Sequence, residues 1–207
     1  MTPEEEPPYA AELFGDRIDV ARAFTADLAR YGEELGLIGP LEVERLWSRH
    51  IVNSALVAPL LQPGRVGDVG SGAGLPGLVL AIARPDSHLV LIEPMERRTE
   101  WLSAESERLG LTNVTVLRGR AEEVSPTPLL DQVTARAVAA LSKLVPLCAP
   151  LLKPGGELIL MKGARVQDEI DAAQKAFRKA GVRDVEVLVL GEGIVPEVTR
   201  VFRAKVD

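Results

Sequence analysis

The chain has 207 residues, of which 46% are hydrophobic and 4% aromatic, and its formal net charge is −6 at pH 7. This length fits one domain with an appendage, and an aliphatic core of this kind suits a buried parallel sheet. No apolar run approaches the roughly 18 residues of a membrane span, and the acidic, proline-rich N-terminus is unlike a signal peptide. One cysteine and two histidines are too few for an internal disulfide or a structural zinc site. We therefore expect a soluble, cytoplasmic protein with no membrane or metal partner.

The N-terminal part of the chain is acidic and is predicted to be helical. Residues 1–63 hold 11 acidic and 5 basic side chains and carry the whole net charge, whereas residues 64–207 are neutral. Residues 1–8 are predicted to be a disordered lead-in. Apolar spacing predicts one helix before residue 32 and a second helical run over 41–61, with Pro59 as a candidate break. We therefore divide the chain into a helical extension, residues 1–63, and a main domain, residues 64–207.

Short apolar runs alternate with helical patterns from residue 64 onward. The predicted strands are 66–69, 88–92, 114–117, 132–135, 158–161, 185–190 and 198–203. The predicted helices are 76–83, 96–109, 141–152 and 166–180, with a turn at 154–156. Alternation requires a parallel sheet covered on both faces, and the last two strands, without a helix between them, should be antiparallel. The expected fold is α/β and Rossmann-like, with the seven-stranded, mostly parallel sheet of class I methyltransferases.

A glycine-rich loop follows the first predicted strand. Gly70, Gly72 and Gly74 lie where ligands bind in open α/β sheets, and the next helix directs free N–H groups at the same place. Glu93 ends the second strand, where a carboxylate can accept hydrogen bonds from both hydroxyls of a ribose. The simpler alternatives are a tight turn for the loop and a surface carboxylate for Glu93. We favour a nucleoside-containing cofactor at this edge of the sheet.

The loop alone leaves several functions open. Residues 72–77 also satisfy the dinucleotide pattern G-x-G-x-x-G, which is typical of NAD-dependent oxidoreductases. Against that reading, both tyrosines precede residue 32, so no Tyr-Lys proton relay follows the loop. A methyltransferase acting on another RNA, a protein or a small molecule is a second alternative. A non-enzymatic nucleotide-sensing module is a third.

Five sequence blocks carry a more specific resemblance. They are Arg49-His50-Ile51-Val52-Asn53-Ser54, Asp68-Val69-Gly70-Ser71-Gly72-Ala73-Gly74-Leu75-Pro76-Gly77, Arg118-Gly119-Arg120-Ala121-Glu122-Glu123, Ala135-Arg136-Ala137 and Leu160-Met161-Lys162-Gly163. Together they resemble the bacterial 16S ribosomal RNA guanine-N7 methyltransferase family, also called glucose-inhibited division protein B, over roughly residues 40–205. The resemblance implies S-adenosylmethionine as cofactor, and 16S ribosomal RNA or a small ribosomal subunit particle as partner.

The same resemblance implies roles for single residues. Gly70, Gly72, Gly74 and Leu75 would line the methionine end of the cofactor, Glu93 would bind the ribose, and Ala121 and Glu122 would frame the adenine. Arg136 would stand at the mouth of the site as the catalytic residue that also meets the cofactor. Its alternative is a structural salt bridge to a carboxylate such as Glu122.

The predicted reaction needs no general base. The Asp/Asn-Pro-Pro-Tyr motif of amino-methyltransferases is absent after the fourth strand, and guanine N7 already presents a lone pair. Arg136 is suited to donate to guanine O6 or to a phosphate. The candidates for phosphate contact, each of which is alternatively a solvated surface charge, are Lys162, Arg165, Arg200 and Arg203. We interpret His50 as a structural residue of the helical extension; the alternative is that His50 and the extension cover the cofactor pocket or meet the RNA.

Overall fold

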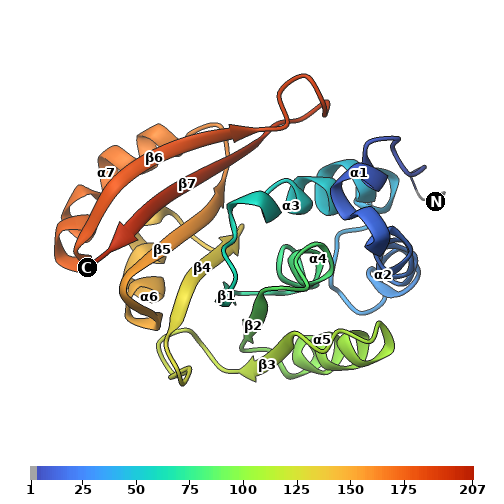
Figure 1. The fold of residues 1–207 in the computed structure, drawn as a ribbon, viewed down its shortest axis with the longest axis horizontal. Helices are drawn as coiled ribbons and strands as arrows, with labels where there is room; N and C mark the ends of the chain where they lie inside the picture. The colour runs from blue at the N-terminus through green and yellow to red at the C-terminus, as the bar shows by residue number, and fades with distance from the viewer. Residues whose placement is uncertain (1–3) are drawn as a thin grey trace.

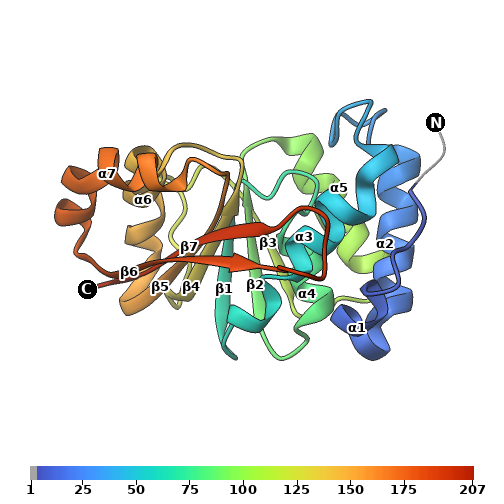
Figure 2. The same cartoon turned by 90° about the horizontal axis from the view of Figure 1, so that it is seen from above.

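The computed structural model describes residues 4–207 and contains one seven-stranded sheet in the order β3-β2-β1-β4-β5-β7-β6 (Figures 1 and 2). Neighbouring strands from β3 to β5 are parallel, and β7 is antiparallel to both β5 and β6. This arrangement confirms the predicted sheet. The strands are β1 (Arg65–Val69), β2 (His88–Glu93), β3 (Val114–Arg118), β4 (Leu130–Arg136), β5 (Leu152–Lys162), β6 (Val182–Leu190) and β7 (Thr199–Val206).

Helices cover both faces of the sheet. Side chains of β2 alternate between the two cores: Leu89 and Leu91 pack on one face, Val90 and Ile92 on the other. One face carries α4 (Gly77–Ala83) and α5 (Glu96–Arg108), and the other carries α6 (Leu141–Cys148) and α7 (Val166–Ala180) (Figure 1). In the described part of the chain, no helix has the length and apolarity needed to cross a membrane.

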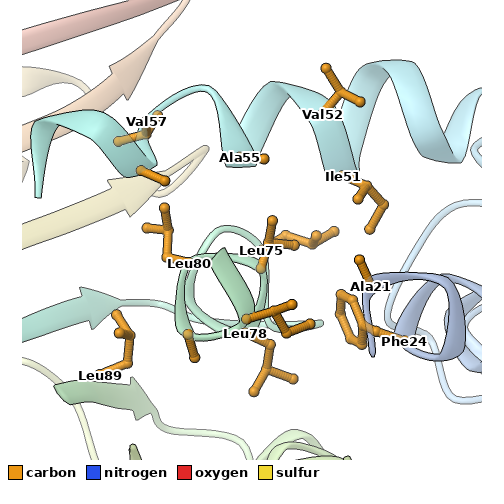
Figure 3. Packing of buried hydrophobic residues seen from close by; sticks show 14 of the residues in the cluster. Ala21, Phe24, Ile51, Val52, Ala55, Val57, Leu75, Leu78, Leu80 and Leu89 are labelled. Atoms are coloured by element: carbon orange, nitrogen blue, oxygen red, sulfur yellow. The ribbon is translucent and has the colours of Figure 1, made fainter. Parts of the chain in front are cut away.

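The helical extension packs directly on α4. Its elements are α1 (Ala10–Phe14), η1 (Gly15–Arg17), α2 (Ile18–Tyr31), η2 (Val43–Arg45), η3 (Leu46–Val52), α3 (Asn53–Ala55) and η4 (Ala58–Leu60). Figure 3 shows Phe24 of α2 and Ile51 of η3 against Leu75 and Leu78 beside the glycine loop. All four side chains are buried, so the extension and the first α/β unit share one hydrophobic core.

Two expectations about the extension need correction. Over residues 4–8 the lead-in is ordered: Ser48 N–H donates to the Glu4 carboxylate at 2.9 Å, and Arg22 pairs with Glu6 at 2.6 Å. Because these carboxylates have hydrogen-bond and ion-pair partners, their negative charge does not keep the segment disordered. Residues 1–3 of the predicted lead-in lie outside the described residues. The second helical run is present but is divided further than the candidate break before Pro59, because a π-helix occupies 46–52 between shorter helical turns. Such widened turns are frequent at functional sites.

The region between α6 and β5 also differs from the prediction. The helix expected over 141–152 ends at Cys148, because Pro150 has no N–H to continue it. The segment 154–156, predicted as a turn, lies within β5, which pairs Leu152 with Leu130, bulges, and resumes where Glu157 meets Gln132. The strand is thus longer at its start than its apolar run indicates.

Candidate functional site

The glycine-rich loop joins β1 to α4, and its glycines differ in whether a neighbouring side chain fills the space that a Cβ atom would take. All three have left-handed φ values: +72° for Gly70, +54° for Gly72 and +94° for Gly74. A Cβ on Gly74 would lie 2.5 Å from the Leu78 side chain, so packing onto α4 explains that glycine. A Cβ on Gly72 would meet only the Gly70 carbonyl oxygen within 4 Å, at 3.8 Å. The loop therefore has an open surface at Gly72, which fits close approach of a ligand.

Glu93 joins the end of β2 to this loop. Its carboxylate accepts hydrogen bonds from the backbone N–H of Gly72 at 2.9 Å and of Met95 at 3.0 Å. The side chain is almost fully buried, and Arg98 lies 4.0 Å from it. The structure thus brings the predicted ribose ligand and the predicted methionine loop together at one edge of the sheet.

The loop after β3 lies beside the end of β2. The N–H of Gly119 donates to the Glu93 carbonyl at 3.1 Å, which holds the start of this loop next to the carboxylate. Ala121 is buried and Glu122 is exposed. The loop predicted to frame an adenine therefore adjoins the residue predicted to bind the ribose.

Asp68, at the end of β1, is a buried carboxyl group to which sequence analysis gave no role. Its Oδ2 atom accepts a hydrogen bond from Gly77 N–H at 3.0 Å, whereas Oδ1 is buried without a partner among residues 4–207. Burial raises the pKa of Asp68 to about 7. Its place near the end of the strand, two residues before Gly70, is the signal in the sequence that could have identified it.

Arg136 ends β4 and carries a desolvated charge. Burial lowers its pKa to about 10, while the charge of Asp68 acts in the opposite direction, so the guanidinium is still protonated at neutral pH. Within residues 4–207 it makes no side-chain hydrogen bond or ion pair, and the alternative salt bridge to Glu122 does not form. The side chain is only partly buried, so its N–H groups are free to donate to a molecule from outside the chain.

Arg136 lines a cavity of about 410 Å³ at the ends of β4 and β5, between the π-helix and β7. We call it the Arg136 cavity. The polar side chains on its wall are Arg49, His50, Asn53, Arg136, Lys162, Glu197, Thr199 and Arg200. The cavity meets the extension on one side and the sheet on the other, so the extension forms part of the site.

The four predicted phosphate-contact residues do not lie together. Lys162 and Arg200 face each other in the register of β5 and β7 and both line the Arg136 cavity. Lys162 is nearly buried, pairs with Glu169 at 2.6 Å and donates to the Ala139 carbonyl at 2.9 Å.

The other two candidates lie outside the cavity. Arg165 is exposed and lines an adjacent hollow. Arg203 pairs with Glu157 at 3.1 Å and with Glu186 at 3.3 Å, further along β7. The structure therefore does not bring Arg203 to the cavity.

His50 is among the residues that line the cavity, as the alternative to a structural role expects. Its Nε2 atom is 2.5 Å from Glu42 Oε2, and Nδ1 is buried without a hydrogen-bond partner in the described chain. Neighbouring Arg49 reaches Glu42 at 3.6 Å and Glu197 at 3.1 Å, on the loop between β6 and β7. The block of residues 49–54 in the family resemblance was the available signal.

No group of three or more histidine, cysteine, aspartate or glutamate side chains in residues 4–207 is arranged to hold a metal ion. The polar groups at the carboxyl edge instead fall into two neighbouring sets. One set surrounds the glycine loop and Glu93, and the other surrounds the Arg136 cavity. The first fits a nucleoside-containing ligand, and the second offers unpaired donors to a second molecule.

Comparison with known proteins gives the family. The family model described as rRNA small subunit methyltransferase G matches residues 17–198. This chain belongs to that family. A relative named Ribosomal RNA small subunit methyltransferase G from Clavibacter michiganensis is 66% identical over 98% of this chain and 96% of its own length. One of the same name from Pseudarthrobacter chlorophenolicus is 51% identical over 96% of this chain and 92% of its own length.

Solved structures of methyltransferases share the fold of this chain. A SAM-dependent methyltransferase from Aquifex aeolicus matches with a TM-score of 0.54 at 19% identity, over 98% of this chain and 95% of that one. M. jannaschii TYW2 in complex with AdoMet matches with a TM-score of 0.58 at 20% identity, over 77% and 76%. The Rossmann-like fold expected from the sequence is confirmed.

Proposed function

We propose that this chain transfers a methyl group from S-adenosylmethionine to N7 of a guanine in 16S ribosomal RNA. The observation that carries the proposal is the position of Arg136, a partly buried and protonated side chain that lines the cavity close to the charge of Asp68 and has no hydrogen-bond or ion-pair partner among residues 4–207. Family membership and relatives named for methylation of small-subunit ribosomal RNA support the substrate class.

The cofactor fits the residues at the carboxyl edge of β1, β2 and β3. Gly70, Gly72 and Leu75 would hold its methionine end, since the loop is open at Gly72 and a side chain there would take ligand space. Glu93 would bind the ribose hydroxyls with the lone pairs that its two backbone hydrogen bonds leave free. Ala121 and Glu122 would frame the adenine. When bound, S-adenosylmethionine supplies a methyl group on a positively charged sulfur.

The protein's chemical task is then positioning. Guanine N7 has a free lone pair and carries no proton, so no side chain has to act as a base. Arg136 would donate to O6, the acceptor next to N7, and thereby fix the orientation of the base. Its partial desolvation strengthens such a bond, because the surrounding dielectric is lower than in water.

Binding of RNA is assigned to the rim of the Arg136 cavity. Arg200 lines the cavity without an ion pair among residues 4–207, and exposed Arg165 lies beside it, so both are placed to meet phosphates. Lys162 has a partner in Glu169 and would act mainly by its charge. Arg203 is held by two carboxylates and would reach RNA only after leaving them.

Transfer of a tritiated methyl group tests the proposal. Small ribosomal particles and deproteinised 16S RNA from a strain lacking this protein would be incubated with labelled cofactor, and the labelled nucleoside identified. We expect 7-methylguanosine from at least one substrate, and comparison of the two shows whether the particle is required. Label in a different nucleoside, or in protein, would contradict the proposal.

A further inference from the structure

The loop between β4 and α6, residues 137–140, lies between the two sets of polar groups at the carboxyl edge. It follows Arg136 directly, and Ala137 lines the Arg136 cavity. On its other side, a Cβ on Gly70 would lie 2.8 Å from Cγ2 of Val138, so the Val138 side chain packs against the glycine loop. The conformation of the 137–140 loop therefore determines how the cavity adjoins the glycine loop.

The backbone of the 137–140 loop is strained at Ala137. Its φ is +55°, in the left-handed region that a residue with a side chain rarely adopts. Such a conformation persists only where the surrounding structure holds it in place. Residues 137–140 belong to no helix or strand, so the contacts that hold them come from neighbouring elements.

Lys162 and Glu169 hold the end of the loop that leads into α6. Lys162 Nζ donates to the Ala139 carbonyl at 2.9 Å and pairs with Glu169 Oε2 at 2.6 Å. The same carboxylate oxygen accepts a hydrogen bond from Leu141 N–H at 3.0 Å. The Lys162 side chain is only 9% exposed. Its departure would leave a half-buried carboxylate without its cation, which is unfavourable.

We propose that Lys162 is a positioning residue for methyl transfer, because with Glu169 it holds the 137–140 loop and so keeps Arg136 and Val138 in place beside the glycine loop. The inference rests on the proposed function. Two of the three donors of the ammonium group are used within the chain. Lys162 therefore acts through the loop, and direct phosphate contact is left to Arg165 and Arg200.

Opposite charge changes on the two partners separate positioning from electrostatics. Lys162→Met removes a positive charge, and Glu169→Ala removes a negative one. If Lys162 served RNA only by its charge, the two variants would change activity in opposite directions, and the double variant would resemble wild type. Positioning predicts instead that both single variants slow methyl transfer, because each one releases the loop.

The rate is measured in a single turnover at saturating S-adenosylmethionine and RNA. We expect each single variant to be slower by at least about tenfold, the effect of one hydrogen bond to a charged group. The double variant should be no slower than the slower single variant, because the loop is already released. In Lys162→Met, RNA affinity should fall by no more than about threefold with an unchanged salt slope, whereas a lost phosphate contact would reduce that slope by about one.

Two exposed charges nearby provide matched controls. Lys143→Met on α6 and Asp168→Ala on α7 make the same charge changes outside the contacts with the loop, and both should keep the wild-type rate. Glu169→Gln retains an oxygen that can accept from Leu141 N–H, so it should lose only about threefold in rate. Circular dichroism and affinity for S-adenosylhomocysteine show whether each variant is folded. If Lys162→Met or Glu169→Ala is unfolded, a wild-type rate in Glu169→Gln would still contradict the proposal.

The outcomes also separate this inference from the proposed function. Wild-type rates in both single variants, opposite changes in the two, or recovery of the wild-type rate in the double variant would overturn the role of Lys162. If the wild-type protein forms 7-methylguanosine in the same experiment, the function stands. A different methylated nucleoside from the wild-type protein would contradict the function, and the rates of the variants would still test the loop.

Discussion

At the scale of single residues, Asp68 makes the stability of the fold depend on pH. Its pKa is about 7 in the folded chain because burial disfavours the carboxylate, whereas an unfolded aspartate ionises near 4. Between these pH values the folded chain binds more protons than the unfolded chain. The contribution of Asp68 to the free energy of unfolding is therefore present below about pH 4 and is lost as the pH rises towards 7.

The variant Asp68→Asn should remove this contribution. The amide oxygen can still accept from Gly77 N–H, so the loop keeps its anchor. We expect the difference in unfolding free energy between variant and wild type to change by up to about 4 kcal/mol from pH 4 to pH 8, in favour of the variant. Urea titrations at several pH values measure it, and parallel curves would contradict the assignment.

Glu93 is predicted to contribute directly to cofactor affinity. Glu93→Ala removes a carboxylate that can bind the ribose, and it leaves the N–H groups of Gly72 and Met95 without their acceptor. We expect a loss of about 1.5–3 kcal/mol in binding of S-adenosylhomocysteine by calorimetry. Glu93→Gln keeps the shape and one acceptor and should lose less. A loss below about 0.5 kcal/mol in the alanine variant would exclude the ribose role.

At the scale of elements, the glycine loop gives a test with a matched control. Gly72 and Gly110 have similar φ values, +54° and +64°, and neither has a side chain near the position of an added Cβ. Each alanine variant should cost about 1 kcal/mol of stability for the left-handed conformation. Only Gly72→Ala should weaken S-adenosylhomocysteine binding, by at least about tenfold. Equal affinity in the two variants would mean that the ligand does not lie on the loop.

The elements also show what sequence could and could not predict. The strands and helices from β1 to α5 were predicted nearly to the residue, because buried apolar runs and glycine or proline boundaries coincide there. The start of β5 was missed because residues 152–156 join the strand only through pairing with Leu130 and a bulge. The π-helix was predicted only as part of a helical run, because the spacing of its buried residues is compatible with an α-helix as well as with a π-helix.

Within the site, the position of each residue in the chain determined whether its neighbours in the fold could be predicted. Glu93 and the glycines end adjacent parallel strands, so their meeting could be inferred from order alone. His50 comes from the extension, whose docking onto α4 depends on packing far apart in sequence. Lys162 and Arg203 were recognised as charges, but their carboxylate partners Glu169 and Glu157 belong to other segments.

At the scale of the whole molecule, the extension and the α/β domain should unfold together. The chain has two tryptophans. Trp47 is buried in the extension, and Trp101 donates from α5 to the Ala73 carbonyl of the glycine loop at 3.1 Å. In Trp101→Phe and Trp47→Phe the remaining tryptophan reports one region. We expect its fluorescence transition in urea to coincide with that of circular dichroism in each variant. An earlier transition for Trp47 would show that residues 1–63 form a separate unit.

The most direct test of the central claim is a single-turnover comparison of wild-type protein with Arg136→Lys. Lysine keeps a positive charge but lacks the planar fork that can hold guanine O6. We predict that the rate of methyl transfer to N7 falls by at least about tenfold, the loss of one charged hydrogen bond, while affinity for S-adenosylhomocysteine changes less than about threefold. An unchanged rate, or a loss confined to cofactor affinity, would show that Arg136 does not organise the transfer.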